Sequence, residues 1–488
     1  MTELAALSAT ELTRRLRERE LHCVELLEYY QQRFEKLNPG INAIINTDFA
    51  AAGERAREAD AALARGENWG PLHGLPITLK DNIETVGLPT TYGVPQYQNH
   101  LAASNADVAQ SLLDAGAVLF GKTNMPAHGM DTQTYNEVFG QSNNPWNVER
   151  TPGGSSGGAA AAVAAGLTGL EIGNDIGGSI RLPAHFCGIY GHKSSYGLVS
   201  MYGPKPWESR HPGYSADVDL VVNGPLARSA TDLELVMDLV AGPPLAQRGA
   251  VTMRMPASRA QTLGDFRVGV WIDEPGYAPD SAVGGVLQQL VDRLAAAGAS
   301  IVTATPQVSI RRVTALRNEF EATALAYTCP ADVYDNALAE VANAPGTVGA
   351  KRTWAQAVTM RYRDWQSINR ERQIMRSQWH DYFGDVDVLL CPVSRIAAHP
   401  HDTTPIPERT VDFDGQPAPY WPVMGPWNSL ALVAYLPATV APAGLTPDGL
   451  PVGVQIIGPY YEDRTPIRFA QVLQEELLGA FELPEGYA

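Results

Sequence analysis

The sequence predicts an α/β fold. Short apolar runs typical of buried strands alternate along the chain with amphipathic or alanine-rich segments typical of helices. The clearest unit joins a strand-like run at 266–272, a helical run at 282–297 and a strand-like run at 300–305. This βαβ order implies parallel pairing through a right-handed crossover. With 488 residues, of which 45% are hydrophobic, the chain is long enough to bury a sizeable core.

The other elements follow from local patterns. Residues 8–37 favour two helices, and Ser8 with Glu11 has the spacing of a capping box at the first of them. Alanine content and i,i+4 charge pairs favour a helix over 50–65. Further helices are predicted at 107–114 and 157–167, and buried strands at 75–79, 117–120, 386–390, 432–440 and 451–457.

Residues 306–425 differ in composition and pattern from the rest of the chain. Long helical stretches carry Trp354, Trp365 and Trp379, and a proline-rich segment over 395–426 carries Trp421. We interpret this region as a helical cap plus a loop over the active site, within a single domain spanning 1–488. The alternative is that these aromatic side chains serve only the core of the cap itself.

Charge and cysteine content exclude several classes of protein. There are 53 acidic and 36 basic residues, and the net charge of −17 argues against a nucleic-acid surface, which needs clustered Lys and Arg. The four cysteines have no paired spacing, so reduced, mostly buried thiols in a cytoplasmic protein are expected. Residues 1–20 are charged and amphipathic rather than a signal peptide, and no apolar run is long enough to span a membrane. We expect no nucleic-acid and no membrane partner.

Two glycine–serine clusters are the main functional signal, GSSGG at 154–158 and DIGGS at 175–179. Glycine allows backbone N–H groups to converge on one point, and a serine beside them combines a nucleophile with an oxyanion hole. Serine also needs a base. Lys80 ends the apolar run PITLK, where burial would keep its amine neutral and able to accept a proton.

Three other interpretations compete with this one. A phosphate-binding loop needs a Lys-Ser or Lys-Thr pair after its last glycine, whereas Gly158 is followed by alanines. A Ser-His-Asp triad could use His128, His185 or His192, but no nucleophile elbow accompanies them. The glycine-rich segments could also be flexible loops, and Lys80 an exposed residue at a strand end.

The same motifs resemble those of the amidase signature family. TPGGSSGGA at 151–159 through DIGGSIRLPAHFCG at 175–188 is similar to the defining stretch of the family, and GLPITLKDN at 74–82 to its lysine motif. Other similar landmarks are NNPWN at 143–147, GPLARS at 224–229 and GLPVGVQIIG at 449–458. The resemblance implies the amidase signature fold, in which helices cover a mixed, largely parallel central sheet and a helical cap lies beside it.

The resemblance also implies a role for each motif residue. Ser179 matches the nucleophile, Lys80 the base, and Ser155 the serine that bridges them after a cis peptide bond. The oxyanion hole would be formed by the N–H groups of Ile176, Gly177, Gly178 and Ser179. Gly129 and Met130 match a segment that lines the acyl pocket. Asp175 and Arg181 flank the nucleophile and are expected to hold its loop rigid as a bidentate ion pair.

The resemblance leaves two functions open. A stand-alone amide hydrolase would use the Ser-cisSer-Lys triad through an acyl-enzyme, whereas the A subunit of a tRNA-dependent amidotransferase would release ammonia from glutamine. Asn174 and Ile176 depart from the commonest residues of the family, and with the aromatic segment 202–219 they favour the hydrolase. A catalytically inactive binding protein is disfavoured because all three triad residues are present.

The expected substrate is a small amide. An aromatic cap with few fixed charges favours aryl or alkyl amides, anilides, carbamates or nylon-like oligomers, as in aryl acylamidase and urethanase-like members. Trp207, Trp354 and Trp421 motivate this prediction. The chemistry requires no cofactor, no metal-binding motif is present, and a homodimer is compatible with the sequence.

Overall fold

The structure, a computed structural model, describes residues 3–203, 205, 218–343 and 352–487. Within these residues the main feature is an eight-stranded mixed sheet, accompanied by a three-stranded sheet and surrounding helices. The predicted α/β fold is therefore confirmed. Trp207 and most of the segment 202–219 lie outside the described residues.

The large sheet has the strand order β10-β9-β11-β15-β14-β7-β8-β6. Its strands are β6 (Glu171–Asp175), β7 (Tyr190–Lys193), β8 (Val222–Ala227), β9 (Arg267–Val270), β10 (Ser300–Val302), β11 (Val388–Pro392), β14 (Ala438–Leu445) and β15 (Pro451–Ile457). Helix α9 (Ser281–Ala296) connects β9 to β10 as the predicted crossover, and β9 pairs in parallel with both β10 and β11.

The prediction of a largely parallel sheet needs correction. Beyond β11 the described neighbours all pair antiparallel, from β11–β15 to β8–β6. The reason is the connections: β14 and β15 are joined by a short turn, which permits only antiparallel pairing, whereas a parallel pair needs a long crossover. The strand-helix-strand pattern at 266–305 therefore predicts the parallel pairing at one end of the sheet correctly, but this pairing does not extend to the other strands.

The small sheet places the predicted base. It consists of β1 (Ile44–Thr47), β3 (Val118–Thr123) and β2 (Pro76–Lys80), with β2 and β3 parallel. Every residue of β2 is buried, as the apolar run predicted, and Lys80 is its last residue. Strand β6 of the large sheet lies beside β2, so the two sheets meet where Lys80 and the DIGGS loop follow their strands.

Most predicted helices are present, with small shifts at their ends. They are α2 (Ala9–Arg17), α3 (Cys23–Ile41), α4 (Phe49–Ala64), α5 (Asp107–Asp114) and α6 (Gly157–Ala164). Further helices that were not predicted are α7 (Arg181–Cys187), α8 (Ala230–Val240) and α16 (Arg464–Leu473). Ser8 accepts a hydrogen bond from the Glu11 N–H at 3.1 Å, as predicted. The Glu11 carboxylate, however, pairs with Arg14 and Arg15.

The strand predicted at 432–440 is partly wrong. Helix α15 (Pro426–Val433) occupies its first residues, and the strand begins only at Ala438. Both elements are fully buried there, and a continuous apolar run has the same appearance in a buried helix and in a buried strand.

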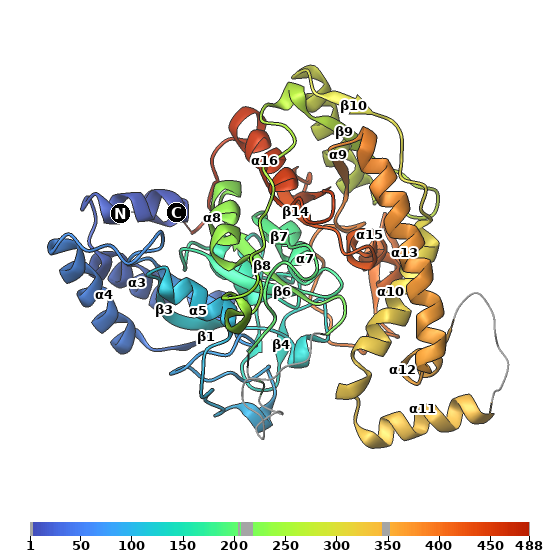
Figure 1. Cartoon of the computed structure of the whole chain (residues 1–488), viewed down its shortest axis with the longest axis horizontal. Helices are drawn as coiled ribbons and strands as arrows, with labels where there is room; N and C mark the ends of the chain where they lie inside the picture. The colour runs from blue at the N-terminus through green and yellow to red at the C-terminus, as the bar shows by residue number, and fades with distance from the viewer. Residues whose placement is uncertain (1–2, 204, 206–217, 344–351, 488) are drawn as a thin grey trace.

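The region predicted as a cap contains most of the remaining helices. They are α10 (Ile310–Ala324), α11 (Ala331–Asn343), α12 (Trp354–Val358) and α13 (Tyr362–Asp385), followed by the hairpin β12 (Thr410–Phe413) and β13 (Gln416–Pro419) and by α14 (Tyr420–Met424). Trp379 of α13 is fully buried, whereas Trp354 of α12 is more than half exposed. Figure 1 shows α13 along one side of the molecule and α11 projecting from its lower corner. The division of the chain into one domain with a cap stays a prediction.

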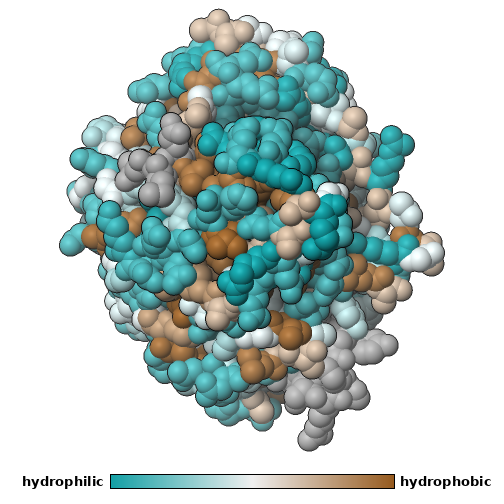
Figure 2. Space-filling view, turned by 90° about the vertical axis from the view of Figure 1, so that its left-hand side faces the viewer, coloured by the Kyte–Doolittle hydropathy of each residue, from teal (hydrophilic) through white to brown (hydrophobic). Residues whose placement is uncertain are grey.

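The two ends of the described chain lie close together. Figure 1 shows both ends on the same side, and Arg33 of α3 donates to the backbone carbonyl of Tyr487 at 2.6 Å. Figure 2 shows that this side is largely hydrophilic, with hydrophobic residues scattered over it. The cysteines are unpaired, as predicted, and Cys23, Cys187 and Cys391 are buried. Among the described residues, no helix combines the length and apolar character needed to cross a membrane.

Candidate active site

Lys80 and Ser155, which are 75 positions apart in the sequence, lie in direct contact. Lys80 Nζ donates to Ser155 Oγ at 2.7 Å and to Asn174 Oδ1 at 2.7 Å. The lysine is completely buried, and this burial lowers its pKa to about 7, although Asp175, Glu171 and Asp81 oppose the shift. A large fraction of Lys80 is therefore neutral near pH 7 and has a lone pair available for a proton.

The two predicted serines lie on loops that touch. The Gly154–Ser155 peptide bond is cis, as the resemblance implies. The N–H of Ser156 donates to the carbonyl of Ser179 at 3.1 Å, which holds the loop before α6 against the loop after β6. Ser155 and Ser179 both line one cavity, and Ser179 remains slightly exposed to it. The structure thus brings Lys80, Ser155 and Ser179 into one place.

The predicted oxyanion loop separates into two parts. Ile176 and Gly177 line the cavity. The N–H of Gly178 instead donates to Asp175 Oδ1 at 2.9 Å, so a carboxylate of the protein already occupies this donor. The contribution of Gly178 to an oxyanion hole stays a prediction, as do those of Ile176, Gly177 and Ser179, which all line the cavity.

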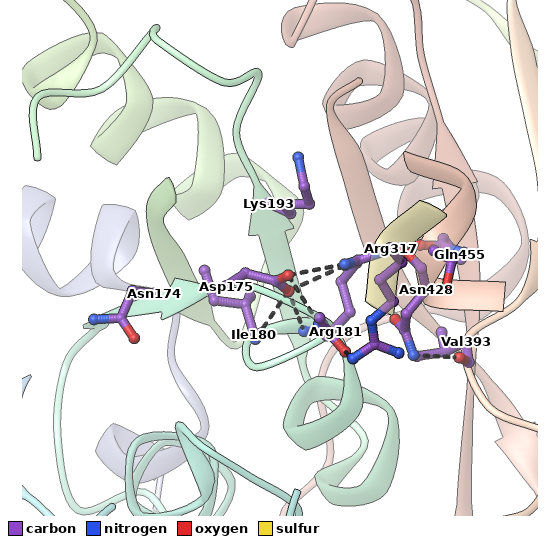
Figure 3. A network of polar contacts seen from close by, with 12 residues as sticks. Asn174, Asp175, Ile180, Arg181, Lys193, Arg317, Val393, Asn428 and Gln455 are labelled. Atoms are coloured by element: carbon purple, nitrogen blue, oxygen red, sulfur yellow. Dashed lines mark hydrogen bonds and ion pairs between the residues drawn. The ribbon is translucent and has the colours of Figure 1, made fainter. Parts of the chain in front are cut away.

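Neighbouring residues of β6 serve opposite sides of the site, because successive side chains of a strand point to opposite faces. Figure 3 shows Asn174 and Asp175 pointing in opposite directions. Asn174 faces Lys80, and its Nδ2 donates to Asn82 Oδ1 at 2.9 Å, which fixes the amide with its oxygen toward the lysine. Asp175 faces Arg181.

Asp175 and Arg181 form the bidentate pair that was predicted. Arg181 donates to Asp175 through Nη2 at 2.8 Å and through Nε at 3.0 Å, and both side chains are fully buried. Burial by itself raises the pKa of the Asp175 carboxyl, but the adjacent Arg181 outweighs it, so the pKa lies below its usual value. Arg181 also donates to Asn428 and Gln455, which ties the nucleophile loop to α15 and β15 (Figure 3).

Breaking this pair is expected to destabilise the fold. Arg181→Met leaves the Asp175 carboxylate buried and unpaired, and the free energy of unfolding should fall by about 3–5 kcal/mol. Urea denaturation followed by circular dichroism measures the difference. Arg361→Met is the matched control, because the Arg361–Asp364 pair is exposed and should contribute nothing measurable. Equal stabilities of the two variants would contradict the structural role of the pair.

The cavity beside the serines has a volume of about 1110 Å³. Its wall is rich in apolar and aromatic side chains, including Met130, Ile176, Leu325, Tyr327, Val358 and Trp421. Gly129 lies against the bridging serine, since an added Cβ there would be 3.4 Å from Ser155 Oγ. The predicted pocket residues Gly129 and Met130 both line this cavity.

Most charged residues on the cavity wall, which also carries Lys205, form ion pairs with one another or with neighbouring side chains. Asp131 pairs with Arg409 at 2.8 Å, Arg317 pairs with Glu321 at 2.9 Å, and Arg352 pairs with Glu319. Because these charges are neutralised within the protein, the cavity favours an uncharged ligand.

Two of the three competing histidines contact groups outside the triad. His185 and His192 are both buried. The ring nitrogens of His185 contact the backbone of Ile396 and Gly453. Those of His192 contact the side chains of Thr439 and Asp463. His128 lines the cavity. In the part of the chain that the structure describes, no cluster of three or more His, Cys, Asp or Glu side chains could hold a metal ion.

Two residues of the site were missed by sequence reasoning. Asn174 was noted only as a departure from the family pattern, although it contacts Lys80. Arg317 lies on α10 and contacts the carbonyl of Gly177, 140 positions away. A single sequence carries no signal for a contact of this range.

Comparison with known proteins agrees with this arrangement. The sequence profile of a family described as Amidase matches residues 25–466. The chain belongs to the amidase family and is a hydrolase acting on carbon–nitrogen bonds.

Individual relatives cover nearly the whole chain. The glutamyl-tRNA(Gln) amidotransferase A subunit of Nostoc punctiforme is 31% identical over an alignment 479 residues long, which covers 92% of this chain and 94% of that protein. A crystal structure of an amidase superposes with a TM-score of 0.78 at 27% identity, covering 96% of this chain and 100% of the other. A 6-aminohexanoate cyclic dimer hydrolase complexed with substrate gives a TM-score of 0.78 at 26% identity and covers 99% of both chains.

Proposed function

We propose that this protein is an amidohydrolase that cleaves the C–N bond of linear amides through a Ser179 acyl-enzyme. The observation that carries the proposal is the buried Lys80 amine, 2.7 Å from Ser155 Oγ, with its pKa lowered to about 7 by burial. A neutral amine in contact with a serine is the base that a hydroxyl nucleophile needs. The contact between the two serine loops supports a proton relay from Ser179 through Ser155 to Lys80.

The reaction follows from these positions. Ser179 Oγ attacks the amide carbonyl while its proton passes to Ser155 Oγ, and the proton of Ser155 passes to Lys80 Nζ. The N–H groups of Ile176 and Gly177 stabilise the negative oxygen of the tetrahedral intermediate. The relay then returns a proton to the leaving amine as the C–N bond breaks. Water attacks the acyl-enzyme by the same route and releases the acid.

The cavity supports a bulky, uncharged substrate. Its volume of about 1110 Å³ and its apolar and aromatic wall suit an aryl or alkyl amide, an anilide, a carbamate or a nylon-like oligomer. Trp421 lines this wall, and its place there supports an aromatic group in the substrate.

A second candidate is glutamine hydrolysis as the A subunit of a tRNA-dependent amidotransferase. The similarity to the corresponding protein of Nostoc punctiforme over 92% of the chain favours it. Glutamine, however, carries an ammonium and a carboxylate that need charged partners, and the charged pairs described above are already neutralised. We therefore rank the self-sufficient amidase first.

Turnover of the purified chain separates the two functions. We expect hydrolysis of 4-nitroacetanilide without added metal or partner, and loss of this activity in Ser179→Ala. L-Glutamine serves as the parallel substrate. Hydrolysis of glutamine alone, or activity only after a partner protein is added, would contradict the first function and support the second.

Asn174→Asp tests whether Lys80 acts as a neutral base. A carboxylate in place of an amide oxygen 2.7 Å from Nζ favours the ammonium and raises the pKa of Lys80. The acidic limb of kcat/KM should move to higher pH by about one to three units, with activity recovered in alkaline buffer. Asn68→Asp, at an exposed asparagine, is the control. An unchanged acidic limb in Asn174→Asp would contradict the assignment of Lys80.

A further inference from the structure

Arg317 connects the cap to the loop that carries the nucleophile. It lies on α10, its side chain is only 1% exposed, and its Nη2 donates to the carbonyl of Gly177 at 3.4 Å. Gly177 and Gly178 both have positive φ, at 117° and 112°, so little in the local backbone fixes the orientation of the peptide between them. External contacts therefore determine it.

The peptide between Gly177 and Gly178 is held at both ends. Its N–H donates to Asp175, which is itself fixed by Arg181. Its carbonyl accepts from Arg317. A flipped peptide would lose both contacts and would bring the Gly178 amide nitrogen toward a guanidinium, which has no acceptor to offer it. The two arginines thus select one orientation of the loop, and with it the direction of the neighbouring N–H groups of Ile176 and Gly177.

Arg317 is itself rigidly placed. Its Nε donates to Glu321 at 2.9 Å, its Nη1 donates to the carbonyl of Gly425 at 3.3 Å, and its guanidinium lies 4.5 Å from the ring centroid of Trp421. The fit is tight on the loop side as well, because a Cβ at Gly177 would lie 2.4 Å from Arg317 Nη2. One buried side chain therefore joins α10, the α14–α15 junction and the oxyanion loop.

We propose that Arg317 is a positioning residue for the oxyanion loop, through which the cap fixes the amides that stabilise the tetrahedral intermediate. The proposal rests on the proposed amidase function and assigns to the cap a part in the chemical step. Its cation, only 1% exposed, also lies next to the loop where negative charge would develop in the tetrahedral intermediate. A side chain of this kind should affect the transition state more than the bound substrate.

Steady-state kinetics of Arg317→Met and Arg317→Lys test the proposal. Each rate is divided by the concentration of active sites titrated with a fluorophosphonate, so that a misfolded fraction does not count. We expect kcat on an anilide to fall about 10- to 100-fold in Arg317→Met, with KM within about twofold. Lysine keeps the charge but lacks the planar fork, so Arg317→Lys should lie between Arg317→Met and the wild type. Arg311→Met is the matched control, at an exposed arginine of the same helix.

A transition-state analogue gives the second readout. A trifluoromethyl ketone forms a tetrahedral adduct with the serine, so its affinity should weaken in Arg317→Met by the same factor as kcat. Unchanged kcat and inhibitor affinity per titrated site would overturn the proposal. A raised KM with unchanged kcat would also overturn it and would make Arg317 a substrate-binding residue. The wild type and Ser179→Ala are measured first, and absence of amide turnover in the wild type would instead refute the proposed function.

Discussion

Ser179→Ala is expected to lower kcat for amide hydrolysis by about 10⁴-fold or more, because the variant lacks the hydroxyl that forms the proposed acyl-enzyme. Ser179 lines the same cavity as Ile176 and Gly177, and its loop contacts that of Ser155. The fold should survive, since the change removes one oxygen atom at the cavity wall. Anilide turnover and circular dichroism of the purified variant check both expectations.

The control for this variant is Ser367→Ala, which removes a hydroxyl from the exposed surface of α13. It should have the activity of the wild type. Turnover in Ser179→Ala within about tenfold of the wild type would contradict the role of this residue, since loss of a covalent nucleophile costs several powers of ten.

Lys80→Met is expected to lower kcat/KM by about 10²- to 10⁴-fold, the range for loss of a general base. Methionine fills much of the same buried space but cannot accept the proton of Ser155. In the wild type, the need for a neutral Lys80 amine should make the activity depend on pH. Below a pH of about 7 the protonated Lys80 cannot act as a base, so kcat/KM should fall with decreasing pH and reach a plateau above it.

The pH profile of Lys80→Met provides the decisive comparison. Its residual activity should lack the acidic limb near pH 7 because the titrating amine is gone. Lys36→Met, on α3 and remote from the cavity, should keep the profile of the wild type. An acidic limb retained in Lys80→Met would assign the titration to another group.

The candidate site was largely predictable because short motifs encode it. The run PITLK correctly predicted a buried strand that ends in a buried lysine. The DIGGS motif correctly placed Asp175 against Arg181, since residues six apart across one tight loop meet by local geometry. The resemblance to a family then predicted that Lys80 and Ser155 meet, which no local pattern could have shown.

The errors have physical causes that a single sequence does not reveal. The last two residues of α15, Leu432 and Val433, are buried like those of β14, so the strand was predicted to begin too early. The contacts of Asn174 and Arg317 depend on groups that lie 94 and 140 positions away, respectively. The largely antiparallel pairing of the sheet depends on strands such as β8, whose sequence VNGPLA contains Gly and Pro and has little strand propensity.

Trapping the acyl-enzyme shows which residue is the nucleophile. The protein is mixed with 4-nitrophenyl acetate, quenched in acid during the burst of 4-nitrophenol, digested and mapped by mass spectrometry. We expect one acetyl group per chain, attached to Ser179, and none in Ser179→Ala. Acetyl groups on Ser155 or another residue, or hydrolysis without a covalent adduct, would contradict this expectation.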